Sequence, residues 1–396
     1  MATRCATVLV ASDWAPIRAF DPIVRSTPEA VYGDLLPLLR AADLRIVNCE
    51  CALTRSGRPV WKSGAVFKGG PDHLPGLTCV PFDVACLANN HVLDYGLPGL
   101  RQTLRLLDRA GIATVGAGLT GEQAHAPLAA SANGVRVHVV NFSEGEDLTA
   151  SDGGPGVSGW DIPRVQRVVR TCKRKGGVVV AIGHCGLEYV PFAPPYVVTA
   201  FRAIADAGAD VVIGHHPHVP QGMEVWNDTP IVYSLGNFVF YQPTPLYHRK
   251  VGFCVELQLE GARLAGLELH PYLITDSGLR RLLPAEDREF RRAAARLSAP
   301  FRTTGGHVRA WNAYLAYYGV EGFTKEVLGI VGRLATEPEK AAAMFRNRVT
   351  TRQHAELWTD FLTGVMNGSR WPYPASAMAL VAEWFTRTAD AALLKG

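Results

Sequence analysis

The chain has 396 residues, of which 48% are hydrophobic and 19% are charged, so it is long enough to form one large domain or two. Its 40 Lys and Arg exceed its 36 Asp and Glu by a formal charge of +4, and this small, unclustered excess gives no reason to expect nucleic-acid binding. The first apolar run reaches Asp13 too early to be a signal-peptide core or a spanning helix, so we expect a cytoplasmic protein without membrane insertion. No pattern in the sequence indicates an oligomeric state.

Hydrophobic periodicity predicts an alternating α/β fold over the first part of the chain. In chain order the expected elements are a strand at 7–11, a helix that starts at Thr27-Pro28 and is broken near Pro37, a strand at 44–48, a long loop at 52–76, a strand at 84–88, a helix at 97–110 and a strand at 112–115. They continue with an antiparallel pair at 127–132 and 135–142 turned by Asn133-Gly134, a flexible glycine-rich connection at 153–156, a helix at 163–175, a strand at 178–183, a helix at 198–207, and strands at 210–213, 231–234, 238–241, 251–259 and 264–269.

The character of the chain changes from about Ser277, where charged, alanine-rich stretches carry helical periodicity. These stretches are 282–297, 324–334 and 338–365. We therefore expect two parts, an α/β domain at 1–276 and a helical C-terminal extension at 277–396 that is attached to the core without a linker. His354 in this extension could reach toward a site, but the pattern favours an ordinary histidine on a helix surface.

Five of the predicted strands lead directly into polar side chains that can bind a metal ion. These side chains are Asp13, Glu50, Asn89, Asn90, His91, Asp94, His184, Glu188, His215, His216 and His218. Ligands of open α/β sheets bind at the carboxyl edge of the strands, so we expect these donors to share one crevice. The spacing of His216 and His218 would place both rings on one side of an extended segment. A solvated polar turn is the alternative interpretation of this histidine cluster.

A mixed set of oxygen and nitrogen donors suits Mn²⁺, Fe²⁺ or Zn²⁺. Six or more donors exceed what one ion needs if a water molecule is to stay bound, so the set favours two divalent metal ions. Two ions about 3.5–4 Å apart can share a hydroxide and bind the oxygens of an attacked phosphate. His91 is our candidate for the acid that protonates the leaving oxygen, and His215 is a second candidate catalytic residue.

Five motifs occur in the order expected of a known family. They are Asn48-Cys49-Glu50, Ala88-Asn89-Asn90-His91-Val92-Leu93-Asp94-Tyr95-Gly96, His184-Cys185-Gly186-Leu187-Glu188, Gly214-His215-His216-Pro217-His218 and Tyr233-Ser234-Leu235-Gly236-Asn237-Phe238. Over about residues 5–275 the chain resembles the CapA-like poly-γ-glutamate capsule biosynthesis family (PGA_cap), a branch of the calcineurin-like metallophosphoesterases. The resemblance implies a four-layer α/β/β/α sandwich with a dinuclear metal site.

The resemblance also implies roles for individual residues. The metal ligands would be Asp13, Glu50, Asn90, His184, His216 and His218, with His91 as acid or transition-state stabiliser. Asn237 and Glu188 would shape the site. Apart from the resemblance, we expect Asn89, Asp94 and Lys68 to support the site or to bind substrate. The chain departs from the pattern at Ser12, usually glycine, at Cys185, often aromatic, and at Ala15, where the superfamily usually has a histidine. The missing histidine would weaken one metal position.

The leading functional hypothesis is a metal-dependent hydrolase that acts on a phosphoester or a related bond in a small-molecule or peptide-like anionic substrate. Lys62, Lys68 and Arg249 lie in loops that could approach such a substrate, although solvated side chains are the ordinary alternative. A second hypothesis is the formation or cleavage of an amide or γ-glutamyl bond, but the chain has no Walker-type loop for ATP-driven ligation. The third is a non-catalytic metal-binding accessory subunit, which Ala15 would favour.

Overall fold

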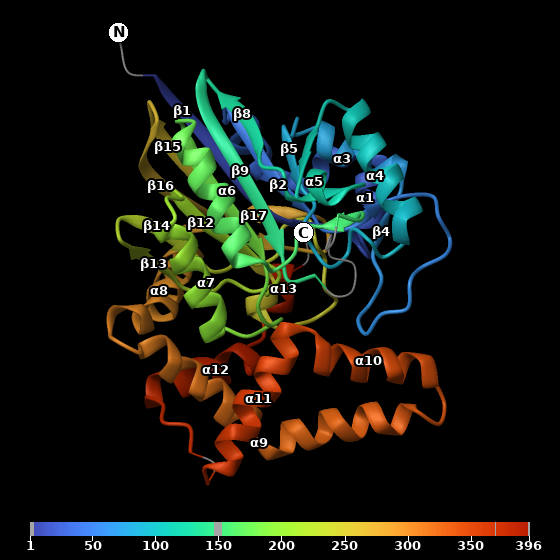
Figure 1. Cartoon of the computed structure of the whole chain (residues 1–396), viewed down its shortest axis with the longest axis vertical. Helices are drawn as coiled ribbons and strands as arrows, with labels where there is room; N and C mark the ends of the chain where they lie inside the picture. Colours follow the sequence, from blue (N-terminus) through green and yellow to red (C-terminus); the bar gives the residue numbers. More distant parts are fainter. Residues whose placement is uncertain (1–3, 146–152, 369, 395–396) are drawn as a thin grey trace.

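Two β-sheets face each other in the centre of the molecule, and helices cover the outer face of each sheet (Figure 1). The computed structural model describes residues 4–145, 153–368 and 370–394. The first three residues of the N-terminal run and the last two of the expected C-terminal extension therefore lie outside the described residues.

The first sheet has seven strands in the order β17-β16-β15-β1-β2-β5-β6. Their bounds are β1 (Cys5–Trp14), β2 (Leu44–Cys49), β5 (Val84–Cys86), β6 (Ala113–Val115), β15 (Val251–Glu260), β16 (Arg263–Ile274) and β17 (Leu279–Arg281). Four neighbours, β1, β2, β5 and β6, are parallel, whereas β15, β16 and β17 add an antiparallel edge.

The second sheet has six strands in the order β13-β14-β12-β11-β9-β8. Their bounds are β8 (Leu128–Ala132), β9 (Val135–Ser143), β11 (Val178–His184), β12 (Val211–His215), β13 (Met223–Trp226) and β14 (Thr229–Val232). Strands β9, β11, β12 and β14 are parallel, so their carboxyl ends lie at one edge of the sheet.

Side-chain alternation along the strands explains the layers. In β1, Val8 and Val10 enter the core between the sheets, while Leu9 packs on the helical side. In β11, Val180 enters the same core, and Val179 packs outward against helices. Because both faces of these strands are buried, the runs are apolar throughout. The four-layer α/β/β/α sandwich implied by the resemblance is thus confirmed.

The helices of the first layer are α1 (Phe20–Ser26), η1 (Pro28–Leu35), α2 (Leu36–Ala41), η2 (Pro71–His73), α3 (Leu74–Thr78) and α4 (Gly96–Arg109), and those on the second sheet are α6 (Ile162–Arg174) and α7 (Pro195–Asp206). Smaller elements are β3 (Ala52–Leu53), β4 (Lys68–Gly69), β7 (Ala117–Gly118), α5 (Gly121–His125), β10 (Gly156–Val157) and η3 (Tyr247–Arg249). The expected helix break occurs at Gly33, whose φ of 50° kinks η1, and Pro37 lies in the first turn of α2. The expected hairpin turn is confirmed, because Asn133 and Gly134 have the positive φ angles of 43° and 77° that such turns require.

Three sequence predictions about local structure are wrong. The segment 238–241 is not a strand: Phe238 and Phe240 are buried in the core beside the end of β1, but the segment forms only the backbone hydrogen bonds of an irregular crossing. The long loop expected at 52–76 contains the short pair β3 and β4 and the helical segment that begins with η2. The connection at 153–156 ends in a strand, because Gly156 begins β10, which pairs with β7.

The expected helical C-terminal region is confirmed. It comprises α8 (Pro284–Ser298), η4 (Ala299–Arg302), α9 (Gly306–Arg333), α10 (Pro338–Thr350), α11 (Arg352–Met366), α12 (Ala375–Thr386) and α13 (Ala391–Leu394). Figure 1 shows α9, α10 and α11 gathered at the end of the molecule toward which β9 runs. Strand β17 extends the first sheet past the boundary expected at residue 276. Among the described residues, no helix has the length and apolarity needed to cross a membrane.

Candidate metal centre

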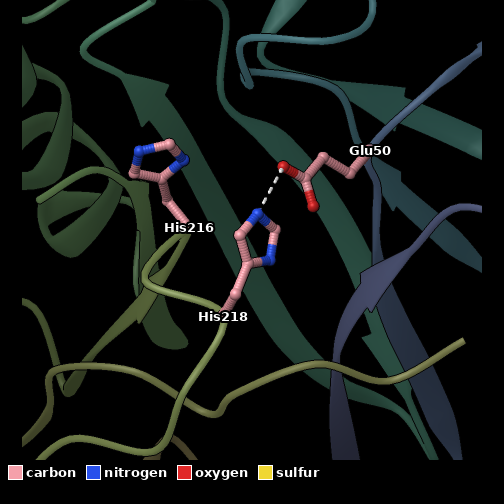
Figure 2. Close-up of side chains that lie close together, drawn as sticks. All are labelled: Glu50, His216 and His218. Atoms are coloured by element: carbon pink, nitrogen blue, oxygen red, sulfur yellow. Dashed lines mark ion pairs between the residues drawn. The ribbon is translucent and has the colours of Figure 1, made fainter. Parts of the chain in front are cut away.

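The polar side chains predicted at the strand ends do meet. Asp13 lies at the end of β1, Glu50 follows β2, His184 ends β11, and His216 and His218 follow β12. All five are buried, and both carboxylates have no exposed surface. Glu50, His216 and His218 can bring one ligand atom each within 4.8 Å of one another, and Figure 2 shows Glu50 pointing toward the ring of His218.

Asp13 is surrounded by nitrogen atoms. Its Oδ1 accepts a hydrogen bond of 2.8 Å from Asn48 Nδ2 and lies 3.5 Å from His215 Nδ1, while its Oδ2 lies 3.5 Å from His218 Nδ1. Burial by itself would raise the pKa of Asp13, but its contacts with His218, His215 and His184 outweigh burial and hold that pKa well below its ordinary value. Asp13 is therefore an ionised carboxylate within the cluster.

His184 connects Asp13 to the other donors. Its Nε2 lies 3.3 Å from Glu50 Oε1, 2.9 Å from Asn90 Oδ1 and 3.1 Å from His216 Nδ1. Burial, reinforced by neighbouring histidines, places the pKa of His184 and of His216 well below the usual value. Both rings are thus neutral, which is the form that binds metal ions.

The backbone after β12 differs from the extended segment expected for the H-x-H pair. Strand β12 ends at His215, and both His216 (φ 97°) and His218 (φ 57°) have positive φ angles that side-chain-bearing residues rarely adopt. Their ring centroids are nevertheless only 5.9 Å apart, and both rings reach the cluster. Such local strain is typical of functional sites, where the surrounding structure holds a residue in an unfavourable conformation.

Whether a metal ion fits the cluster can be judged from its buried polar atoms that lack a hydrogen-bond partner. Both carboxylate oxygens of Glu50 and the Nε2 of His216 are buried without a hydrogen-bond partner. Burial, and then the negative charge of Asp13, raise the pKa of Glu50 well above its ordinary value. A buried carboxylate without partners is costly, and a divalent cation bound by Glu50 and the neutral histidines would remove that cost. The donor set therefore fits the metal ions that the sequence predicts.

His91 belongs to a second buried group at the rim of the cluster. Its Nδ1 lies 2.7 Å from Asp94 Oδ2, and Asp94 Oδ1 lies 2.9 Å from Lys62 Nζ. Burial alone would raise the pKa of Asp94, but the charges of His91 and Lys62 lower it, so this carboxylate is ionised. His91 is close enough to the ligand histidines for its charge to contribute to the low pKa of His184.

Three of the predicted supporting residues lie at or near the cluster. Asn237 Oδ1 lies 2.8 Å from His218 Nδ1, and Asn89 donates from Nδ2 to the Cys49 carbonyl next to Glu50. The negative charge of Glu188 acts on His218 and on Glu50.

Two further predicted residues are placed differently from what their proposed roles need. His215 contacts Asp13, and its Nδ1 lies 3.2 Å from the hydroxyl of Ser12, so it lies beside a predicted ligand and that ligand's neighbour in the chain. Lys68 is exposed, and its ammonium donates to the Ser56 carbonyl and lies 5.0 Å from the centroid of the Tyr95 ring. The contacts of Lys68 with Ser56 and Tyr95 therefore lie outside the cluster of predicted ligands.

Sequence reasoning misjudged Lys62 and His354. Lys62 was expected either to approach a substrate or to be solvated, yet it is buried and paired with Asp94. The interpretation of His354 as a surface histidine of a helix is wrong, because its Nδ1 is buried without a hydrogen-bond partner and its charge acts on His216. Burial, followed by the charge of Arg348, lowers the pKa of His354 to about 3.

Sequence reasoning assigned no role to Asn48 and overlooked Glu144. Asn48 Nδ2 contacts both Asp13 Oδ1 at 2.8 Å and His184 Nδ1 at 3.1 Å, so this amide orients two ligands. Glu144 directly follows β9 and accepts a hydrogen bond of 3.3 Å from the Gly186 backbone. Its position after an apolar run is the signal that identified the other donors, and the same rule would have found it.

Comparison with known proteins agrees with the family that the motifs predict. Residues 7–242, more than half of the chain, match the family described as bacterial capsule synthesis protein PGA_cap. A PGA biosynthesis protein CapA of Bacillus subtilis is 32% identical over 54% of this chain and 57% of its own length. A capsule biosynthesis protein CapA of Bacillus anthracis is 35% identical over 41% of each chain. A probable polyglutamine synthesis accessory protein of Mycobacterium tuberculosis is 31% identical over 52% of this chain and 59% of its own.

The matched region spans about half the length of these relatives. Among solved structures, a novel phosphatase from Mycoplasma pneumoniae matches 68% of this chain and 94% of its own with a TM-score of 0.43 and 12% identity. A hypothetical protein from Thermus thermophilus matches 68% of this chain and 99% of its own with a TM-score of 0.42 and 14% identity. These two likenesses say nothing about activity. Because the family match covers residues 7–242, the chain belongs to the PGA_cap family of bacterial capsule synthesis proteins.

Proposed function

We propose that the chain is a metal-dependent hydrolase that uses two divalent ions, Mn²⁺, Fe²⁺ or Zn²⁺, to attack a phosphoester or a related bond of an anionic substrate. The observation that carries this proposal is the Glu50 carboxylate, which is buried with both oxygens unpartnered beside His216 Nε2, also unpartnered. These atoms lie at the meeting edge of two sheets, where α/β proteins bind ligands. The ions would be held by Asp13, Glu50, Asn90, His184, His216 and His218.

Bound ions of this kind supply a hydroxide at neutral pH and bind the oxygens of the attacked group. The side chains of the protein would orient the ligands and supply the proton. Asn48 holds Asp13 and His184 in place, and Asn237 fixes the ring of His218 through its Nδ1. His91, fixed through Nδ1 by Asp94, is the residue that would deliver a proton to the leaving oxygen.

Elemental analysis coupled to a substrate screen tests the proposal. The purified chain is reconstituted with Mn²⁺, Fe²⁺ or Zn²⁺, its metal content is measured, and aryl phosphates, phosphodiesters and nucleotides are offered. We expect about two ions per chain and turnover that disappears in His184→Ala and Asp13→Ala. His307→Ala is the matched control, because His307 lies at the start of α9 and stacks on Phe301. A metal-replete chain without turnover across the panel would contradict the proposal.

A second candidate is the formation or cleavage of an amide or γ-glutamyl bond. It is favoured by the names of the relatives, which refer to PGA and polyglutamine synthesis. Release of glutamate or appearance of a peptide product, with phosphoesters untouched, would select this reaction. The relative from M. tuberculosis is named an accessory protein, and fewer than one bound ion per chain after reconstitution would favour a non-catalytic accessory role.

A further inference from the structure

Two arginines converge on one tyrosine at the rim of the candidate centre. The guanidinium carbon of Arg249 lies 3.7 Å from the centroid of the Tyr189 ring. Arg18 donates from Nη1 to the Tyr241 carbonyl at 2.8 Å, and the Tyr189 phenol acts electrostatically on Arg18 as well as on Arg249. Gln242 donates to the Tyr189 hydroxyl at 3.2 Å and so fixes the ring between the two cations.

Each arginine is one aromatic ring away from a histidine of the site. The Tyr189 ring stacks on His218 with centroids 5.8 Å apart. On the other side, Arg18 lies 5.6 Å from the centroid of Phe67, whose ring lies 4.1 Å from that of His91. Arg249 therefore lies on the side of the predicted ligand His218, and Arg18 lies on the side of the candidate acid His91.

The backbone at these positions is strained. Arg18 and Tyr189 have φ angles of 59° and 66°, a conformation that side-chain-bearing residues seldom adopt. Arg18 lies just beyond β1 and Tyr189 in the segment after β11, the strands that end in Asp13 and His184. Strained residues at the ends of ligand-bearing strands are typical of sites that hold a substrate in place.

The positive charge of this rim is only partly offset by neighbouring carboxylates. Within the described residues, neither Arg18 nor Arg249 forms an ion pair with a carboxylate, although the charge of Glu188 acts on Arg249. Lys250, buried nearby, donates to the Gln242 carbonyl. Burial mainly, and also the charge of Arg18, lower the pKa of Lys250 to about 8. Lys250 thus adds a third basic side chain beside the two arginines, although the charge of Asp276 also acts on it.

Guanidinium groups bind carboxylate and phosphate oxygens through two parallel hydrogen bonds, and they bind more strongly where water is partly excluded. We propose that Arg18 and Arg249 form a subsite that holds a carboxylate or phosphate group of the substrate other than the group under attack. The subsite rests on the proposed function, since it selects substrates for the same centre. It narrows the substrate class to molecules that carry at least two oxyanion groups.

Three matched series of probes test the subsite. They are alkyl phosphates, which have no second oxyanion, ω-phosphonooxy carboxylates, whose second oxyanion is a carboxylate, and alkanediol bisphosphates, whose second oxyanion is a phosphate. Each series has spacers of two, three and four carbons. Dissociation constants are measured by calorimetry on the Mn²⁺-loaded full chain, and KM is measured for each probe that is turned over. We expect at least one doubly anionic series to bind about 10- to 100-fold more tightly than the alkyl phosphates. The preferred series identifies the second group as carboxylate or phosphate.

The variants Arg18→Gln, Arg249→Gln and their combination should abolish this preference and leave the affinity for alkyl phosphates unchanged. Arg249→Lys should retain part of it, because the charge remains while the fork of donors is lost. Arg105→Gln, on the exposed side of α4, is the matched control and should retain all of it. Thermal unfolding of each variant checks that the chain is folded.

The outcomes separate the subsite from the proposed function. A preference that is lost in the variants, without turnover of any probe, supports the subsite and counts against the hydrolase. Turnover with equal KM values for all three series, or a preference that survives in the double variant, overturns the subsite and leaves the hydrolase intact.

Discussion

Asp94 and His91 form a buried pair in which the carboxylate Oδ2 lies 2.7 Å from the imidazole Nδ1. Asp94 also accepts a hydrogen bond of 2.6 Å from the Phe67 backbone and contacts the Lys62 ammonium. One carboxylate thus fixes the tautomer and the orientation of His91 and ties the loop that carries Lys62 and Phe67 to the rim of the centre. The pairing commits Nδ1 of His91 to Asp94.

Asp94→Asn should therefore lower turnover by about 10- to 100-fold and leave the metal content unchanged, because the amide cannot hold the Nδ1 proton of His91 in the same way. Turnover and elemental analysis are measured on the same preparation. Asp83→Asn is the matched control. Asp83 accepts hydrogen bonds from the backbone amide and the side chain of Arg45, and it lies just before β5, at the end of that strand away from His91. Equal losses in both variants would mean that the effect is one of stability.

Asn237→Ala should weaken metal binding by about 10- to 100-fold, because the amide that lies 2.8 Å from His218 Nδ1 fixes the ring of a ligand. The measurement is a competition titration of each metal ion against a chromophoric chelator. Asn312→Ala is the control, since Asn312 donates to the Pro372 carbonyl among the C-terminal helices. Unchanged metal affinity in Asn237→Ala would show that His218 needs no such support, or that it is not a ligand.

Ala15→His should destabilise the chain rather than add the ligand that the superfamily usually has there. Ala15 has no exposed surface, packs in the core of the first helical layer and donates its backbone amide to the Val239 carbonyl at 2.8 Å. An imidazole in that space costs about 1–3 kcal/mol through overpacking. Denaturant unfolding measures the cost, and elemental analysis should show no extra ion. A stable variant with a higher metal content would show that only the missing histidine limits the second position.

The sequence could predict that these side chains lie together because the information was local. A strand buried on both faces reads as an apolar run, and parallel strands present their carboxyl ends at one edge, so the donors after β1, β2, β5, β11 and β12 had to be neighbours. The same rule failed where packing rather than pairing fixes the backbone. Phe238 and Phe240 look like alternate strand residues, yet both are buried in a segment that crosses the end of β1 without a ladder.

Contacts between elements that are distant in the chain could not be predicted from the sequence. Nothing near Lys62 in the chain indicates that Asp94 will neutralise it, and nothing near His354 indicates that α11 will carry its ring into the neighbourhood of His216. Lys340 of α10 donates to the carbonyls of Lys62 and Gly64, so the C-terminal helices also contact the loop that supports the candidate acid. These contacts depend on how the helical region docks on the sandwich, which periodicity does not encode.

Glu144 gives the stability of the chain a dependence on pH. Burial, opposed only in part by Tyr196, by the Gly186 backbone and by Arg352, raises the pKa of Glu144 to about 8. A carboxyl group with a raised pKa keeps its proton in the folded chain after the unfolded chain has lost it. Its contribution to stability is therefore complete below about pH 4.5, the ordinary value, and is lost as the pH rises to about 8.

Glu144→Gln should remove this loss, because the amide stays neutral at every pH. The variant and the parent chain should have similar free energies of unfolding at pH 4.5, and the variant should be more stable by roughly 2 kcal/mol at pH 8, a figure reduced for the partial exposure of the residue. Urea unfolding of the metal-stripped chains across this range measures the difference. Glu122→Gln, in the first turn of α5, is the control and should follow the parent at each pH. If the parent chain gained stability relative to Glu144→Gln as the pH rose, Glu144 would be an ionised, partnered carboxylate, and its position after β9 would make it a further candidate ligand of the centre.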